Sequence, residues 1–334
     1  MLWLTVLACD GGNSGSADDS GLAEPLEYQD VSVGHRQACA VLVDGRMTCW
    51  GEDPEVLESY GWTYAGDGHP LDGSNWAMVE LTNAANDSVA SQSACALDQS
   101  GQVTCWGAEF GGCDAVGACW PTESFIDVVV GLKHACGRTA SGDAYCWGSV
   151  FGVGSHLAAD AAGLEAEFVS VNILHEDGSH SRYVAADESD HGWFHERVTY
   201  SEHPLELSIV GRSADCVLDT DQRVLCDPFD AEAESVDDGL RSVVAWQAPT
   251  DAVFVSGFEN RGGFCALDKT GLLFCDADPE DSERVVPGEV SGTFASISLH
   301  PEAADSGCGV ELDGSIRCWG GRVVEPDAAA LRWP

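Results

Sequence analysis

The sequence is most constrained by cysteine pairs that recur with nine residues between their members. Twelve of the fifteen cysteines fall into such pairs, which are Cys39/Cys49, Cys95/Cys105, Cys136/Cys146, Cys216/Cys226, Cys265/Cys275 and Cys308/Cys318. Cys113 and Cys119 form a closer pair, and Cys9 is left over. A spacing repeated along the chain indicates one small structural unit used several times.

Each spaced pair has the local pattern of a β-hairpin. In residues 95–105, CALDQSGQVTC, Gly101 stands where a type I turn followed by a bulge needs a left-handed residue. The glycines in the same place of other pairs are Gly45, Gly142, Gly271 and Gly314. Pairing Asp98 with Gln102 sets the two cysteines opposite each other at a non-hydrogen-bonded position, where antiparallel strands come closest.

This geometry favours disulfide bonds over a metal or redox site. The expected separation suits a cross-strand disulfide. A zinc site needs two close pairs that converge on one ion, and a thioredoxin-like site needs a CxxC motif, which the sequence lacks. We therefore expect the six spaced pairs to be bonded, and Cys113 with Cys119 as a seventh disulfide.

A short strand-like run precedes each cysteine pair, and these runs define a repeat. Their last apolar residues are Val33, Val89, Val130, Val210, Val255 and Ile297. The wide gap after Val130 predicts a further unit whose first strand ends at Val171 and whose cysteine positions hold Val184 and Phe194. A period of about 42 residues is typical of repeat architectures. Seven such units predict an all-β fold, a seven-bladed β-propeller of four-stranded blades with cross-strand disulfides.

The repeated pattern V-x-V-G…C-A-L-D-x-x-G-x-V-x-C-W-G resembles the cysteine-bearing bacterial variant of the regulator of chromosome condensation repeat. It is clearest in residues 39–51, 95–107, 136–148 and 308–320, and the resemblance covers residues 28–334. Asp227 and Asp276 replace the tryptophan in two copies. Propellers of that family act as exchange factors for a small nuclear GTPase, as chromatin binders or as secreted β-lactamase inhibitors. The resemblance therefore implies a non-enzymatic protein-binding scaffold.

Charge and cysteine content limit the compartment and the partners. The chain has 56 acidic and 15 basic residues, a formal net charge of −41. Such a surface repels phosphate backbones, which excludes nucleic acid, and it remains compatible with cationic partners, divalent cations or solubility in a salty medium. Fifteen cysteines favour an oxidising compartment.

The N-terminus, MLWLTVLACDGG, resembles a bacterial lipoprotein signal in which a cysteine after a small residue is lipidated. We expect residues 1–8 to be the remnant of a signal peptide, Cys9 to be lipidated, residues 9–27 to be a flexible acidic Gly/Ser linker, and residues 28–334 to form the propeller. The expected location is the bacterial cell envelope or the extracellular space, with membrane contact only through the lipid and a monomeric state.

Four tryptophans at one repeat position, Trp50, Trp106, Trp147 and Trp319, are expected to pack between blades. The candidate partner-binding residues lie outside the repeat frame and are Trp62, Trp76, Trp120 and Trp193. Aromatic side chains of this kind contact proteins or glycans, and local packing is the alternative. Extra residues fall at 51–77, 113–119, 172–183, 256–264 and 298–307. We expect these insertions to share the face opposite the constant hairpin turns and to carry the function.

Histidines crowd into residues 175–203. His175, Asp177, His180, His191 and His195 are candidate ligands for zinc or another divalent cation, although the HxxxH spacing of His191 and His195 would fit one ion only on a helix. His35 and His134 precede cysteines and are expected to be structural. The sequence contains no GxSxG, P-loop, GxGxxG or HExxH motif, so neither an enzyme nor a bound cofactor is expected. The first alternative to a protein-binding scaffold is a glycan- or divalent-cation-binding surface module, and a metal-dependent enzyme ranks after it.

Overall fold

Every regular element in the described part of the chain is a β-strand. The computed structural model describes residues 26–34, 37–51, 75–82, 93–107, 121–132, 134–148, 151–166, 170–177, 179–185, 193–198, 205–210, 214–219, 223–228, 243–247, 254–260, 263–277, 290, 292–300 and 303–320. Within these residues, no helix is long and apolar enough to cross a membrane.

The described strands form seven separate antiparallel sheets, which we call blades 1 to 7 in chain order. Blade 1 contains β1 (Tyr28–Val33), β2 (Gln37–Leu42) and β3 (Met47–Gly51). Blade 2 contains β4 (Trp76–Leu81), β5 (Ser93–Asp98) and β6 (Val103–Gly107). Blade 3 contains β7 (Phe125–Val130), β8 (His134–Thr139), β9 (Ala144–Gly148) and β10 (Gly152–Ala158).

The remaining blades follow the same up-and-down order. Blade 4 contains β11 (Ala161–Ala166), β12 (Ser170–His175), β13 (His180–Ala185) and β14 (Trp193–Val198). Blade 5 contains β15 (Leu205–Val210), β16 (Ala214–Asp219), β17 (Arg223–Pro228) and β18 (Val243–Gln247). Blade 6 contains β19 (Phe254–Asn260), β20 (Gly263–Asp268) and β21 (Leu273–Ala277). Blade 7 contains β22 (Phe294–His300), β23 (Ala303–Glu311) and β24 (Ile316–Trp319).

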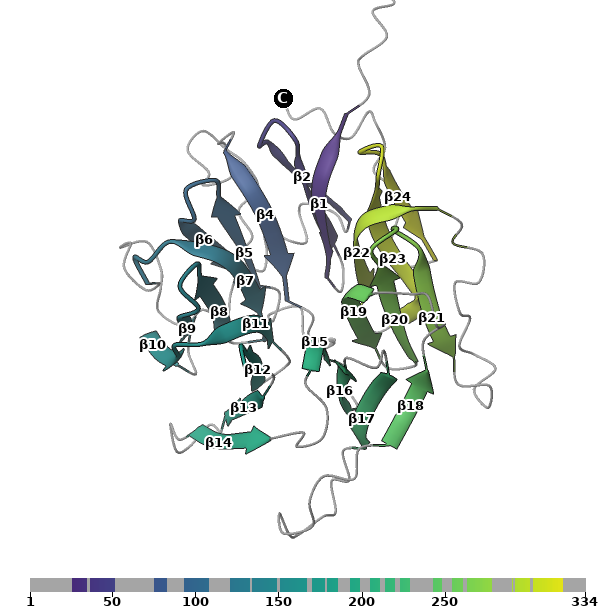
Figure 1. Cartoon of the computed structure of the whole chain (residues 1–334). Coiled ribbons are helices and arrows are strands. Elements are labelled where there is room, and N and C mark those ends of the chain that lie inside the picture. The colour runs from purple at the N-terminus through teal and green to yellow at the C-terminus, as the bar shows by residue number, and fades with distance from the viewer. Residues whose placement is uncertain are drawn as a thin grey trace, which may run out of the picture.

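The first strands of the blades surround a common centre, as Figure 1 shows. Each contacts the first strand of the next blade, in the order β1, β4, β7, β11, β15, β19 and β22, and β22 contacts β1. The N–H of Tyr28, at the start of β1, donates to the carbonyl of Gly314 in blade 7 at 2.7 Å. This arrangement is a β-propeller, as the sequence predicts.

The hairpin turns match the sequence-based prediction closely. The turn glycines 45, 101, 142, 271 and 314 have φ between 82° and 88°. The N–H of Gly101 donates to the Asp98 carbonyl at 2.9 Å, and the Gly101 carbonyl accepts from Phe125 N–H of the next blade at 2.9 Å. A Cβ at Gly101 would lie 2.5 Å from the Phe125 carbonyl oxygen. This glycine therefore serves both the turn and the junction between blades.

Four of the predicted disulfides join described side chains: Cys39–Cys49, Cys95–Cys105, Cys136–Cys146 and Cys308–Cys318. In each, the Cα atoms are 4.0 Å apart, which confirms the close, non-hydrogen-bonded register. Cys216 lies opposite Cys226 in the strand register, and Cys265 lies opposite Cys275, so the disulfides of these two pairs stay predictions. Cys9, Cys113 and Cys119 lie outside the described residues.

The hydrophobic core lies between blades, and this explains the Cys-Trp sequence of the repeat. Neighbouring residues of a strand face opposite sides of the sheet. Cys95 and Cys105 of blade 2 pack with Phe125 and Trp147 of blade 3, and the last disulfide packs with Tyr28 of blade 1. In the four described disulfides, the cysteines therefore face the following blade, and the tryptophan after each disulfide faces the preceding one.

The sequence-based frame is wrong in blade 4. In blade 3, the first strand ends with Val130 opposite Ala135, and the next residue, Cys136, lies opposite Cys146. In blade 4, the first strand ends with Ala166 opposite Val171, and the next residue, Asn172, lies opposite Arg182. The cysteine positions are therefore Asn172 and Arg182. Val184 and Phe194 do lie opposite each other, but they join β13 to β14. The valine of EFVSV belongs to the second strand, because the first strand is the less apolar run AAGLEA.

The first strand of blade 2 also differs from the expectation. It is β4, which ends at Leu81, whereas the expected run ending near Val89 lies outside the described residues. The extra residues expected in blade 4 at 172–183 are its central hairpin, β12 and β13. In blades 6 and 7, β19 extends to Asn260 and β22 to His300, so part of the apparent insertions prolongs strands.

Candidate functional site

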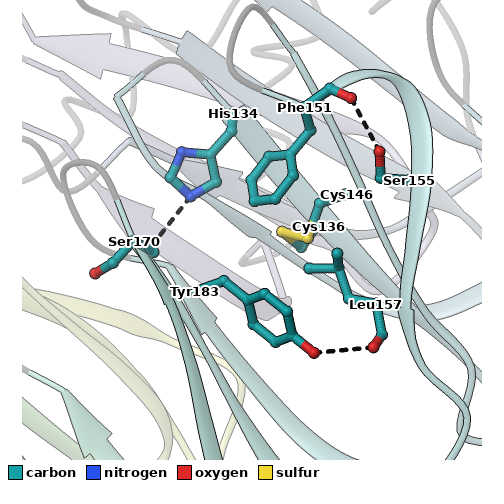
Figure 2. Close-up of a disulfide and its surroundings, with 8 residues drawn as sticks. All are labelled: His134, Cys136, Cys146, Phe151, Ser155, Leu157, Ser170 and Tyr183. Carbon is teal, nitrogen blue, oxygen red and sulfur yellow. Dashed lines mark hydrogen bonds between the residues drawn. A yellow bond between two sulfur atoms is a disulfide. The ribbon is translucent and has the colours of Figure 1, made fainter. Parts of the chain in front are cut away.

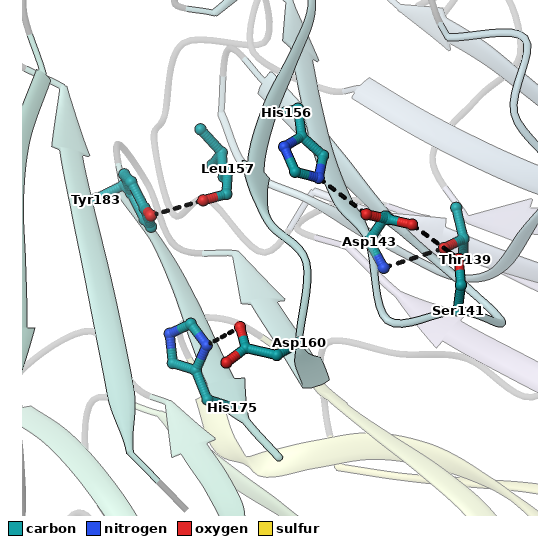
Figure 3. A network of polar contacts seen from close by, with 8 residues as sticks. All are labelled: Thr139, Ser141, Asp143, His156, Leu157, Asp160, His175 and Tyr183. Carbon is teal, nitrogen blue, oxygen red and sulfur yellow. Dashed lines mark hydrogen bonds and ion pairs between the residues drawn. The ribbon is translucent and has the colours of Figure 1, made fainter. Parts of the chain in front are cut away.

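In blade 4, His175 forms hydrogen bonds through both of its ring nitrogens. The ring Nδ1 lies 2.6 Å from Asp160 Oδ1, and Nε2 lies 2.6 Å from Ser181 Oγ. The Asp160 carboxylate can only accept, so Nδ1 donates to it. His175 is 6% exposed, and Figure 3 shows it turned toward Asp160 at the start of β11. Both ring nitrogens are thus engaged, which argues against His175 as a metal ligand.

The other candidate ligands are Asp177, His180, His191 and His195. Asp177 is exposed, and its Oδ1 accepts from the Ser179 N–H at 2.8 Å, which closes the turn. His180 pairs with Val198 and His195 with Tyr183, an odd offset that puts the two positions on opposite faces of the sheet. His191 lies outside the described residues. Among described residues, no group of three or more His, Cys, Asp or Glu side chains could hold a metal ion.

Asp160, His175 and Ser181 have the order of a serine-hydrolase relay, from carboxylate to imidazole to hydroxyl. A nucleophile must reach its substrate, however, and Ser181, the second residue of β13, is only 1% exposed. These hydrogen bonds connect the start of β11 to β12 and β13 of the same blade. We therefore assign it to holding blade 4 together.

His134 has a structural role, as the sequence predicts. It is fully buried between blades 3 and 4, where Nε2 donates to the Ser170 carbonyl at 3.1 Å and the ring meets Phe151 edge-on at 5.4 Å. Burial lowers the pKa of His134 to about 4, and the Ser170 hydrogen bond opposes this shift. His134 is thus neutral at pH 7. Figure 2 shows it beside the Cys136–Cys146 disulfide. His35 lies outside the described residues.

Trp76 is not an exposed loop residue, contrary to its assignment as a partner contact. It begins β4, is 7% exposed, and packs with Cys39 and Val41 of blade 1. It stands where other first strands begin with Tyr28, Phe125 and Phe294, so its position is part of the repeat. Trp193 lies opposite Ala185 in β14, and Trp62 and Trp120 lie outside the described residues.

The four repeat tryptophans pack between blades, as expected. Trp147 is fully buried against Phe125, with ring centroids 5.6 Å apart, and Trp319 meets Phe294 at 5.8 Å. Trp50 and Trp106 pack on the clusters at the junctions of blades 7 with 1 and 1 with 2. Each tryptophan lies opposite an alanine or glycine in the register, which leaves room for the indole ring.

Three half-buried carboxylates on the first strands of blades 1 to 3 were missed from the sequence. Asp30 Oδ2 accepts from the Val79 N–H of the next blade at 2.9 Å, and Asp127 lies 3.7 Å from Arg138. Burial raises the pKa of Asp30 to about 6, and burial with repulsion from Asp30 and Asp127 raises the pKa of Glu80 well above its usual value. The signal was a carboxylate within the first strand of a blade, among apolar residues. Asp30 and Glu80 link blades 1 and 2, through Val79 and Ser32, whereas Asp127 is paired within blade 3.

Among the described residues, the exposed large apolar side chains lie on the hairpin-turn face. The large hydrophobic side chains that are exposed in the described chain are Val43 (53%), Ile126 (53%), Leu272 (46%) and Leu312 (63%). Val43 and Leu312 take the same turn position in blades 1 and 7, and Leu272 ends the turn of blade 6. Ile126 follows Phe125, which is bonded to the turn of blade 2. All four therefore lie on this face, which we call the turn face.

Carboxylates surround these aliphatic side chains. The acidic residues of the described turns are Asp44, Asp98, Asp143, Glu176, Asp177, Asp268, Glu311 and Asp313, and the basic ones are Arg46 and Lys269. Hydrogen bonds from the backbone of Arg46 and from Ser315 lower the pKa of Asp44 and Asp313, and those from Ser141 and His156 lower that of Asp143. The turn face is thus negatively charged with apolar side chains between the charges.

Comparisons with known proteins support the fold. Residues 125–149 match the family described as regulator of chromosome condensation (RCC1) repeat. Human WBSCR16 superposes with a TM-score of 0.58 at 12% identity, over 82% of this chain and 85% of that one. The CRINKLY WD40 ectodomain of the Arabidopsis thaliana receptor kinase ACR4 superposes with a TM-score of 0.54 at 15% identity, over 88% of this chain and 98% of that one. Yeast RCC1 (Prp20), in a structure with Kap60, superposes with a TM-score of 0.53 at 12% identity, over 81% of this chain and 78% of that one. Curated proteins give no match.

Proposed function

This chain is a β-propeller of regulator of chromosome condensation repeats, and from that premise we propose that it is a non-enzymatic protein-interaction scaffold. The observation that carries the proposal is the closed ring of blades with disulfides buried between them. A rigid ring of this kind presents loops and turns in fixed positions, where binding residues are commonly found. Yeast Prp20, which shares the fold, is bound to Kap60 in its structure, and this supports protein binding as the role.

The scaffold acts outside the cytoplasm in this proposal. Four disulfides support an oxidising environment, since such bonds form and persist there. Lipidation of Cys9 would anchor the propeller to a bacterial cell envelope through the linker at residues 9–27. The net charge of −41 argues against nucleic acid as a partner. The propeller works as a monomer with seven four-stranded blades.

A crosslinking pull-down tests this function. The full chain, purified oxidised, is immobilised and exposed to envelope fractions of the source cell with a short amine-reactive crosslinker. The matched control bait is the same chain after reduction and alkylation. The proposal expects a protein that is captured by the oxidised chain and lost with the control bait. If the oxidised bait captures nothing that the control does not, the scaffold function is wrong.

A further inference from the structure

The first strands of neighbouring blades are joined by side-chain oxygens that accept backbone N–H groups of the next first strand. Ser298 of blade 7 accepts from the Val33 N–H of blade 1 at 2.9 Å. Ser32, which takes the same register position in blade 1, accepts from the Leu81 N–H of blade 2 at 3.0 Å. A neutral hydroxyl therefore suffices to join two blades, and this contact does not need a charge.

Carboxylates occupy these positions in blades 1 to 3. In blade 2 the position of Ser32 holds Glu80. Asp30 of blade 1 accepts from the Val79 N–H of blade 2 at 2.9 Å, and the same position of blade 3 holds Asp127. We call Asp30, Glu80 and Asp127 the inner carboxylates. Three first strands in a row thus carry an acidic side chain where blade 7 has only serine.

Positive charge near the inner carboxylates is scarce. Within the described residues, Arg138 of β8 is the cation in contact with them, 3.7 Å from Asp127. Glu80 belongs to β4, which packs against β1, β2, β5 and β7. Of the ionisable side chains on these strands, Tyr28 of β1 packs toward blade 7, and Asp98 of β5 is hydrogen-bonded within its own turn. The other two inner carboxylates are therefore the charges that face Glu80.

A bound proton relieves the repulsion within this group, because like charges in close proximity disfavour ionisation. Burial together with the charges of Asp30 and Asp127 raises the pKa of Glu80 well above its usual value, and burial raises the pKa of Asp30 to about 6. The Ser32 hydroxyl accepts from the Leu81 N–H, so its own hydrogen donates to Glu80. A neutral Glu80 can still accept that hydrogen bond, and the junction is complete when the proton is bound.

We infer that the inner carboxylates share a proton in the folded ring, and that its release as the pH rises loosens the junction of blades 1 and 2. The three groups titrate as a coupled set, with Glu80 as the main site of the proton. In the unfolded chain such carboxylates release their protons near about pH 4. Above that pH the folded ring binds more protons than the unfolded chain, so stability falls as the pH rises. The inference rests on the fold and does not depend on the proposed function.

Melting temperatures measured against pH test for the proton. The full oxidised chain and its Glu80→Gln variant are melted between about pH 4.5 and about pH 9. The amide mimics the neutral acid, so the wild type should melt at progressively lower temperature than the variant as the pH rises, and the two should converge at the acidic end. Groups that titrate alike in both proteins, His134 among them, cancel in this difference. A constant difference over the range would overturn the inference.

The matched control is Glu27→Gln, the same exchange at an exposed carboxylate. Its melting temperature should keep a constant difference from the wild type over the whole range. A pH dependence equal to that of Glu80→Gln would overturn the inference, because loss of any acidic side chain would then explain the result.

Hydrogen exchange of the wild type locates the effect and needs no variant. After correction for base catalysis, the amides of β4 should exchange at least roughly tenfold faster at about pH 9 than at about pH 5, the change that one unit of pKa produces. The Val79 and Leu81 N–H groups are bonded across the junction, so its opening exposes them. The amides of β22 in blade 7 should change less. Equal acceleration in both strands, or none in β4, would overturn the inference.

Asp30→Asn separates coupling between the carboxylates from packing. The amide oxygen of asparagine can still accept from the Val79 N–H, so the contact is kept while one charge is removed. Glu80 then loses its proton more readily, and the pH at which β4 exchange accelerates should move to a lower value. An unmoved midpoint would overturn the assignment of the proton to a coupled group.

Discussion

Blades 3 and 4 are neighbours with the same register, yet one is held by a disulfide and the other by polar contacts. In blade 3, Cys136 and Cys146 are bonded and fully buried. In blade 4 the same positions hold Asn172 and Arg182. The turn is nevertheless kept: His175 N–H donates to the Ser179 carbonyl at 2.8 Å, as Thr139 N–H does to Asp143 at 2.9 Å.

The difference shows that the hairpin does not depend on its disulfide. The aromatic contact across the junction is kept, because Tyr183 stands in the tryptophan position and packs near the blade 3 disulfide. Its hydroxyl donates to the Leu157 carbonyl at 3.0 Å (Figure 2). The Asp160–His175–Ser181 chain adds a polar tie within blade 4 (Figure 3). Register and turn define the blade, and the disulfide adds stability to it.

The largest effect is expected from the aromatic position. Trp147→Ala should lower the free energy of unfolding by about 3–5 kcal/mol, because a fully buried indole leaves a cavity beside Phe125. Tyr183→Phe at the equivalent position of blade 4 should cost only about 1 kcal/mol, the loss of one hydrogen bond. Urea denaturation measures both. A cost of Trp147→Ala no larger than that of Tyr183→Phe would contradict the packing role of the buried indole ring.

Replacing a turn glycine by alanine should cost different amounts of stability at different junctions between blades. Gly101→Ala should destabilise by about 3 kcal/mol, since its Cβ would meet Phe125 N at 2.9 Å and O at 2.5 Å in addition to the positive φ. Gly142→Ala, at the junction of blades 3 and 4, should cost about 1–2 kcal/mol, because its nearest atoms are 3.5 Å away and only the φ penalty applies. Thermal melts of the two variants decide this, and a larger cost at Gly142 would refute it.

Removing the disulfide of blade 3 and introducing one in blade 4 tests the comparison directly. Removing the blade 3 disulfide by Cys136→Ala with Cys146→Ala should cost about 2–4 kcal/mol. Introducing Asn172→Cys with Arg182→Cys in blade 4 should form a disulfide, and it should raise stability by about 2–3 kcal/mol. Thiol titration and denaturation under oxidising and reducing conditions measure the two effects. Free thiols that persist at 172 and 182 after oxidation would contradict the register.

Acid should weaken the junction of blades 3 and 4 through His134. The folded pKa of about 4 lies below the ordinary value of 6.5, so the unfolded chain binds a proton that the folded chain refuses. The free energy of unfolding therefore falls as the pH drops from 6.5 toward 4, by on the order of 2 kcal/mol. His134→Gln can still donate to the Ser170 carbonyl and does not titrate. The stability difference between the two proteins should change over this window, and a constant difference would exclude His134 as the source.

The hairpins were predictable because their determinants are local. The turn glycine, the closing pair and the cysteine spacing all lie within about ten residues. Blade 4 was misplaced because a valine run was followed rather than the turn: Gly178 stands six residues after Asn172, as Gly101 does after Cys95. The strand β4 was missed because Trp76 lies inside a long segment without cysteines, between Cys49 and Cys95.

The candidate site was harder to predict than the fold. Constant turn length indicates where insertions are absent, but it does not show which turn residues are apolar and exposed. Val43 and Leu312 reveal a common face only when the ring brings blades 1 and 7 together. The paired roles of Asp160 and His175 likewise depend on the packing of β11 against β12, which no local spacing encodes.

The central claim is a propeller stapled by cross-strand disulfides in an oxidising environment, and intact mass with peptide mapping tests it most directly. The native protein is alkylated with and without prior reduction and then digested. The account predicts no alkylation before reduction, a lipid adduct on Cys9, and crosslinked peptides joining Cys39 to Cys49, Cys95 to Cys105, Cys136 to Cys146 and Cys308 to Cys318. Alkylation of these cysteines without reduction would contradict it.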